Sequence, residues 1–209
     1  RTFTAYQVPD IIDIDQPQAL EENSAHPVWC TFEVPQDAQP GLYNTHLEVV
    51  NAETNKVVKR LSLKLRVNNR TLPTAHDQKF HVDFWQQPYA VSRQAGVERW
   101  SQAHIDSLKP YLKLLARSGQ KVVSAILFYE PWGDQSFDKF SPMVQTTKCS
   151  NGTWRYDYSV FDRWVEACQE CGIDKQINCF SMVPWDMSFR YYDEALQRDV
   201  DLKTSTSSQ

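Results

Sequence analysis

Three segments in the second half of the 209-residue chain share one layout: a short apolar run, a polar side chain near its end, and a tryptophan close to a proline. Carboxylates and amides bond sugar hydroxyls, and the flat indole stacks on the C–H face of a pyranose. Strand ends are where α/β barrels present such groups to ligands. The layout therefore predicts a carbohydrate site. The segments are residues 80–88, 125–132 and 177–185, which supply Asp83 with Trp85, Glu130 with Trp132, and Asn178 with Trp185.

Each polar candidate also has a structural interpretation. Asp83 and Trp85 are two positions apart and lie on the same side of an extended strand, so they can contact a sugar together. Alternatively, Asp83 caps a loop and Trp85 fills the mouth of a barrel. The amide of Asn178 can hold an acetamido or hydroxyl group, or it can bond the backbone of neighbouring loops.

Glu130 and Arg190 are the charged candidates. Glu130 follows an apolar run and is placed to accept a bond from a sugar hydroxyl, whereas Arg190 can donate two hydrogen bonds to a substrate. The alternative for both is an ion pair within the protein. Its partners would be Lys121 or Arg93 for Glu130, and Asp186 or Asp193 for Arg190.

The composition excludes several classes of partner. A net charge of −4, from 22 basic and 26 acidic residues, argues against nucleic acid and against a polybasic membrane surface. No apolar stretch approaches the roughly 20 residues that span a bilayer. Seven tryptophans, nine tyrosines and ten phenylalanines against six glycines are typical of carbohydrate-active proteins, although large cores also use aromatic residues. The chain begins at Arg1 rather than methionine, so we expect a processed or truncated N-terminus.

Cysteine spacing indicates neither a metal nor a redox cofactor. Cys168 and Cys171 form a C-x-x-C, but it falls within a helical pattern and has no second pair and no histidines at ligand spacing. We expect these thiols to be buried on a helix, reduced and metal-free, and we expect the protein to need no cofactor.

The elements that must position the candidates fall into two regions. Residues 1–70 alternate between apolar and polar side chains in runs at 28–34, 43–50 and 57–67, separated by polar turns. This pattern predicts part of a β-sandwich. Residues 68–77 are polar and contain a proline, so the boundary between a sandwich domain, 1–70, and a second domain, 71–209, is placed there.

The second domain alternates strands with helices. Apolar runs predict strands at 80–84, 121–128 and 175–180, with helices at 101–118 and 159–171 and a long loop at 130–156. Pro110 should bend or split the first helix. A βαβαβ order gives a parallel sheet, but a (β/α)8 barrel needs about 250 residues. We therefore predict an α+β, multidomain protein: a partial β-sandwich followed by the first part of a TIM-like (β/α)8 barrel.

Several motifs in this order resemble glycoside hydrolase family 123. They include Asp83-Phe-Trp-Gln-Gln-Pro88 and Glu130-Pro-Trp132, with further matches at residues 27–29, 40–43, 156–164, 171–178 and 184–192. The resemblance implies a glycosidase that removes terminal β-linked N-acetylgalactosamine from the end of a glycan. It also implies export to the periplasm or surface of a Gram-negative bacterium.

The family's mechanism is substrate-assisted retention, in which an adjacent Asp-Glu pair orients the acetamido group and supplies the proton. The resemblance places that pair on a later barrel strand, beyond Gln209. We interpret the adjacent pair present here, Asp193-Glu194, as a solvated loop pair and expect this chain to be a fragment with little activity.

Two other interpretations remain open. A non-catalytic carbohydrate-binding module would use the same aromatic and polar residues without an acid–base pair. A purely structural protein would bury its aromatic rings instead of exposing them in a cleft.

Overall fold

The computed structural model describes residues 17, 19–180, 183–205 and 207 of the chain. It divides into two compact units, Arg1–Leu72 and Pro73–Gln209. Within the described residues, no helix is both long enough and apolar enough to cross a membrane.

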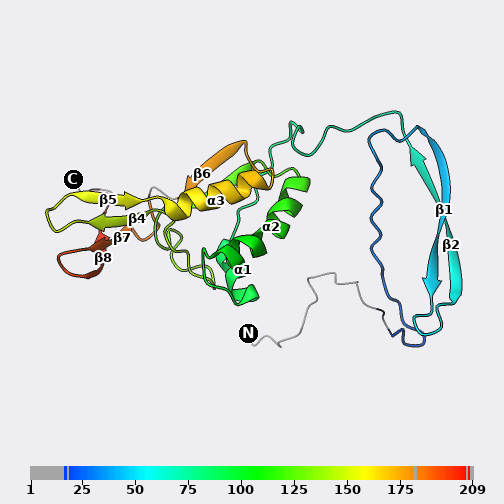
Figure 1. The fold of residues 1–209 in the computed structure, drawn as a ribbon, viewed down its shortest axis with the longest axis horizontal. Coiled ribbons are helices and arrows are strands. Elements are labelled where there is room, and N and C mark those ends of the chain that lie inside the picture. Colours follow the sequence, from blue (N-terminus) through cyan, green and yellow to red (C-terminus); the bar gives the residue numbers. More distant parts are fainter. Residues whose placement is uncertain (1–16, 18, 181–182, 206, 208–209) are drawn as a thin grey trace. The chain divides into compact units, whose positions relative to one another are not determined.

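The first unit is built around one long antiparallel hairpin, β1 (Gly41–Val50) with β2 (Val57–Val67), as Figure 1 shows. The side-chain oxygen of Asn51 accepts the N–H groups of Glu53 and Thr54 and so closes its turn. The strand predicted at residues 28–34 is wrong: this segment has no regular secondary structure and pairs with no other strand. An alternating segment becomes a strand only where a second strand supplies its backbone hydrogen bonds. A β-sandwich is therefore not confirmed among the described residues.

In the second unit, a parallel pair of strands carries helices on one face. Strand β3 (Val122–Ile126) pairs with β6 (Gln176–Phe180), beginning at Val122 opposite Gln176. Helices α2 (Gln102–Arg117) and α3 (Ser159–Glu170) pack against Val123 and Ala125 of β3. The main core consists of Ile105, Leu108, Leu112, Val123, Ala125, Met143, Trp164, Val165, Ala167, Cys168, Cys171 and Ile173.

Of the two effects predicted for Pro110, a bend or a split of the helix, the split is wrong. The helix is one element from Gln102 to Arg117. Leu108 and Leu112, on either side of the proline, are both buried in the same core, and this burial holds the two halves together. Tertiary packing therefore outweighs the local cost of the proline.

Residues 80–84 do not form the predicted strand, and glutamine side chains make most of the hydrogen bonds that a strand would make here. Only Val82 forms a backbone bridge, to Gln120, and the rest of the contact with β3 uses glutamine side chains. The Gln120 amide accepts from the Phe84 N–H at 2.8 Å and donates to the Phe84 carbonyl at 3.1 Å. The Gln86 amide accepts from the Ser124 N–H at 2.8 Å. We call this arrangement the glutamine ladder, because two amide side chains satisfy backbone groups that a strand would otherwise pair.

A short helix, α1 (Pro88–Ala95), follows the ladder directly and was not predicted. Pro88 occupies its first turn, and the Gln87 side chain accepts from the N–H of Tyr89 as a cap. Gly96 ends the helix in the left-handed region, at a φ of 64°. The cap fixes the start of α1 at Pro88, three residues after Trp85.

A four-stranded sheet includes residues 145–148 and 154–157, which overlap the predicted loop at 130–156, together with residues 188–193 and 198–203. Its order is β5-β4-β7-β8, with β4 parallel to β7 and the other pairs antiparallel. The described residues therefore form a mixed α/β unit without a closed barrel, and a TIM-like barrel is not confirmed. The strands are β4 (Gln145–Lys148), β5 (Trp154–Asp157), β7 (Ser188–Asp193) and β8 (Arg198–Lys203).

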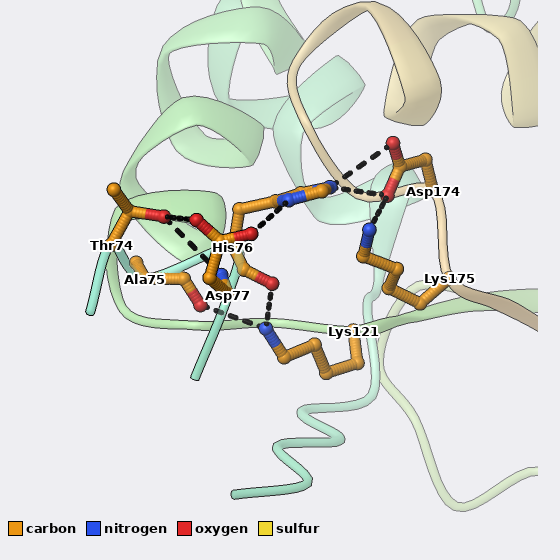
Figure 2. Close-up of polar contacts among 7 residues, drawn as sticks. All are labelled: Thr74, Ala75, His76, Asp77, Lys121, Asp174 and Lys175. Atoms are coloured by element: carbon orange, nitrogen blue, oxygen red, sulfur yellow. Dashed lines mark hydrogen bonds and ion pairs between the residues drawn. The ribbon is translucent and has the colours of Figure 1, made fainter. Parts of the chain in front are cut away.

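Residues 74–77 are fixed at the amino ends of β3 and β6, as Figure 2 shows. The buried Lys121 ammonium donates to the carbonyls of Ala75, at 2.7 Å, and His76, at 2.8 Å. The His76 ring lies 3.0 Å from a carboxylate oxygen of Asp174, which precedes β6. We call this set of contacts the amino-end clamp. The clamp lies at the amino ends of β3 and β6 and does not involve their carboxyl ends.

Candidate functional site

Three aromatic rings meet beyond the carboxyl ends of the parallel strands. Trp85 and Trp132 stack with ring centroids 5.4 Å apart and planes inclined by 13°. The ring of Phe180, the last residue of β6, lies 5.0 Å from Trp85 and 5.7 Å from Trp132. Trp85 and Trp132, which the shared layout assigns to one carbohydrate site, therefore do lie together. Because the two indoles contact each other, a third ring can stack only on an outer face, and Trp85 is 63% exposed.

A cavity of about 260 Å³ opens beside this aromatic cluster. It is smaller than the roughly 300–1,000 Å³ that drug-sized ligands occupy, so its size fits one sugar ring rather than an extended chain. Trp185 forms another wall, and its backbone N–H bonds the Pro131 carbonyl at 2.9 Å. The lining residues are Trp85, Gln86, Gln87, Ser124, Trp132, Gln135, Ser136, Phe140 and Trp185.

A polar layer lies on the same face of the sheet as this cavity. The Asn178 amide donates to Asp83 Oδ2 at 3.1 Å, and Asn178 stands opposite Ser124 in the register of β3 and β6. Within the described residues, Asp83 Oδ1 and the Ser124 hydroxyl are buried and have no hydrogen-bond partner. Unpaired buried oxygens are rare and call for an explanation. Asp83 itself does not line the cavity, although the sequence predicted that it would reach it.

Glu130 does not reach the aromatic cavity either. Its backbone is in the left-handed region, at a φ of 42°, and its carboxylate accepts the N–H of Phe140. The two ion pairs considered for it are both wrong, because Arg93 pairs with Asp138 at 2.9 Å and Lys121 belongs to the amino-end clamp. Glu130 therefore closes the loop that carries Trp132.

Arg190 is also held by the protein. Its guanidinium makes two bonds to Asp201, at 2.8 and 3.0 Å, and lies 3.8 Å above the Tyr129 ring. The predicted pairing with Asp186 or Asp193 is wrong, because β8, which supplies Asp201, was not foreseen. The hydrogen bond from Arg190 lowers the pKa of the Asp201 carboxyl. Arg190 and Glu130 both line a separate polar cavity of about 160 Å³.

The comparison with protein families decides the class of the chain. The model of the glycoside hydrolase 123 catalytic domain matches residues 85–209. The chain belongs to glycoside hydrolase family 123. A second model, for the N-terminal domain of the same family, matches residues 1–51. No curated protein matches the chain.

A solved structure of a family 123 glycoside hydrolase from Clostridium perfringens, studied for glycolipid glycan hydrolysis, is similar at 30% identity with a TM-score of 0.76. The match covers 83% of this chain and 32% of that enzyme's chain. The chain thus spans about a third of the length of its family 123 relative.

The adjacent carboxylates of this family 123 chain, Asp193-Glu194, lie at the turn between β7 and β8. Asp193 is 6% exposed, so the prediction of a solvated pair is wrong for it. Its carboxylate accepts the N–H groups of Ala195, at 2.9 Å, and Leu196, at 3.1 Å. Glu194 pairs with Arg155 at 2.9 Å. These contacts give both carboxylates structural roles, and neither lines the aromatic cavity.

The two C-x-x-C thiols are buried near the end of α3, as predicted. Burial raises the pKa of the Cys168 thiol. Among the described residues, no group of three or more His, Cys, Asp or Glu side chains is placed to hold a metal ion. That these cysteines are reduced and metal-free stays a prediction.

Sequence reasoning missed several residues of the site. The pair Gln86-Gln87 carries no signal in the sequence beyond its place in the family motif, yet Gln86 builds the ladder and Gln87 caps α1. Ser124 was hidden inside an apolar strand, and only the alternation of side chains along β3 could have marked it as facing the cavity. Gln135, Ser136 and Phe140 carry no local signal of function.

Proposed function

We propose that this protein acts as a glycosidase on a glycan terminus and that the aromatic cavity binds the terminal sugar. The observation that carries the proposal is the stacked pair Trp85–Trp132 at the carboxyl ends of parallel strands, in a chain of family 123. Aromatic faces suit the C–H faces of a pyranose, and the polar layer beneath them suits its hydroxyl groups.

Three tryptophans and the polar layer take distinct roles in this proposal. Trp85 and Trp185 offer exposed ring faces to the sugar, and Trp132 supports Trp85 from behind. Asp83 and Asn178 bond each other outside the cavity lining, so they are assigned to positioning the polar layer rather than to direct contact with the sugar. Glu130 and Arg190, which the sequence assigned to the substrate, instead hold the loop that includes Trp132 and the strand β7, through a bond from the Phe140 N–H to Glu130 and two bonds from Arg190 to Asp201.

The substrate we propose is a terminal β-linked N-acetylgalactosamine, cleaved by substrate-assisted retention. The acetamido oxygen attacks the anomeric carbon as the bond to the leaving oxygen breaks, and a carboxylic acid protonates that oxygen. Water then opens the cyclic intermediate, giving its proton to the same carboxylate, and the β configuration is restored. Asp193 and Glu194 are not assigned to these steps, because their oxygens already hold the β7–β8 turn and β5. We also propose that the protein is exported to the periplasm or cell surface.

A binding titration and an activity assay test the proposal together. Calorimetry with methyl β-N-acetylgalactosaminide should detect binding to the 209-residue chain. Trp85→Ala should weaken it by roughly 3- to 10-fold, the equivalent of one aromatic contact. Trp154→Ala is the matched control, since this half-exposed tryptophan lies on β5 outside the cavity. Equal losses in both variants, or no binding at all, would contradict the proposal.

The activity assay separates the enzyme from the second candidate, a carbohydrate-binding module. We expect the 209-residue chain to release little chromogenic aglycone from a β-N-acetylgalactosaminide, because its cavity has no acid–base pair among the lining residues. A longer product of the same gene that carries the Asp-Glu pair should release it readily. If that longer product binds the sugar without turnover, the binding-module function is correct. Robust turnover by the 209-residue chain that Glu194→Gln abolishes would instead make Asp193-Glu194 catalytic.

A further inference from the structure

Ser124 is a polar residue in the middle of an otherwise apolar strand. Its neighbours Val123 and Ala125 face the core beneath α2 and α3. Side chains alternate along a strand, so Ser124 faces the other way, toward the cavity that it lines. Its side chain is almost completely buried, with the residue only 1% exposed.

The backbone of Ser124 is fully satisfied, whereas its hydroxyl is not. The N–H donates to the Gln86 amide at 2.8 Å, and the carbonyl accepts from the Trp164 indole at 3.0 Å. The hydroxyl oxygen has no hydrogen-bond partner among the described residues. A buried hydroxyl without a partner destabilises the folded state, and alanine would fit the same position without that cost. The fold alone therefore does not explain a serine here.

The walls around the hydroxyl indicate what it can bind. Trp85, Trp132, Phe140 and Trp185 make the cavity largely aromatic, and a hydrogen bond formed in such surroundings is stronger than one in water. A pyranose combines flat C–H faces with polar groups around its edge, so a ring stacked on an indole directs an edge at the inner wall. A serine hydroxyl both donates and accepts, and it suits a sugar hydroxyl or an amide group equally.

We propose that Ser124 is a sugar-binding residue whose hydroxyl bonds a polar group on the edge of the bound ring. This inference rests on the proposed function and adds to it a residue on the inner wall of the cavity. It carries a consequence that a structural serine would not have: the hydroxyl weakens the empty protein and strengthens the complex. Removing it should therefore change stability and affinity in opposite directions.

The test compares Ser124→Ala with the wild-type chain in two measurements. Its melting temperature should be equal to or above that of the wild type, because an unpaired polar atom is removed. Its affinity for methyl β-N-acetylgalactosaminide in calorimetry should fall by about 3- to 10-fold, the usual range for one hydrogen bond. Ser124→Cys keeps a similar volume with a weak hydrogen-bonding group, and it should show the same loss of affinity if the alanine variant does not fold.

Two further variants make each outcome decisive. Ser107→Ala, on the exposed face of α2, is the serine control and should bind the sugar like the wild type. Trp85→Ala reports on the cavity itself. If Trp85→Ala loses affinity and Ser124→Ala does not, this inference is overturned while the proposed function stands. A lower melting temperature in Ser124→Ala would also overturn it, because it would assign the hydroxyl a structural bond. A wild-type chain that binds no sugar would refute the proposed function, and this inference with it.

Discussion

The glutamine ladder gives the sharpest test of how this fold holds its site. Gln120 is 2% exposed, and its amide makes three hydrogen bonds: two with the backbone of Phe84 and one, at 2.6 Å, to the carbonyl of Val122. Gln120→Ala removes all three and leaves the N–H of Phe84 without its acceptor, while the Phe84 carbonyl still accepts from the Gln86 amide. At about 0.5–1.5 kcal/mol for each bond, the free energy of unfolding should fall by about 2–4 kcal/mol.

Urea denaturation followed by tryptophan fluorescence measures this loss. With a slope of about 2 kcal/mol per molar urea, the midpoint should fall by roughly 1–2 M. Gln102→Ala is the matched control, because this exposed glutamine bonds the side chains of Asp106 and Arg163 at the surface. Its midpoint should stay within about 0.3 M of the wild type. A Gln120→Ala midpoint as close as that would refute the idea that side-chain amides replace a strand here.

Three further predictions concern charged and thiol groups. Arg190 keeps the pKa of Asp201 below its usual value near 3.8, so the ionised carboxylate stabilises the fold above that pH and loses this contribution as the pH falls through the lowered pKa. In urea denaturation between pH 2 and 7, the midpoint of Asp201→Asn should therefore fall less steeply toward low pH than that of the wild type. An equally steep fall would contradict the assignment. Asp193→Ala should cost about 1–2 kcal/mol of stability, because two backbone N–H groups lose their acceptor, and it should leave sugar affinity at the wild-type value in calorimetry. Cys168 is buried and its thiol pKa is raised, so it should react with a thiol reagent only on unfolding, whereas the exposed Cys30 should react at once in the native chain. Equal reaction rates for the two thiols would show that α3 is not packed as described.

The sequence predicted those elements whose apolar periodicity is strong. Strand β3 is fully buried, and α2 and α3 each present a continuous apolar face to the same core. The strands of the four-stranded sheet were missed because they are short, because β5 and β8 are largely exposed, and because the pairing of β4 with β7 joins segments far apart in the chain. The segment at 80–84 looks like a strand locally, but its partners are glutamine side chains, which no apolar pattern encodes.

The candidate site was predicted where the backbone stays regular and missed where it turns. Trp85 and Trp132 have equal offsets from neighbouring parallel segments, and the structure brings them together. The same reasoning failed for Glu130, because its positive φ redirects the side chain away from the line of the strand. Ser124 was missed because a single serine in an apolar run becomes informative only when its hydroxyl is found without a partner.

The amino-end clamp has a mechanical consequence. Residues 74–77 follow directly after the boundary between the two units, and Lys121 and Asp174 fasten them to the starts of β3 and β6. Any pull on the chain from residues 1–72 is therefore borne first by these few polar contacts. These contacts lie at the amino ends of the parallel strands, whereas Trp85 and Trp132 lie beyond the carboxyl ends, so we expect a pull to break the clamp before it disturbs the cavity.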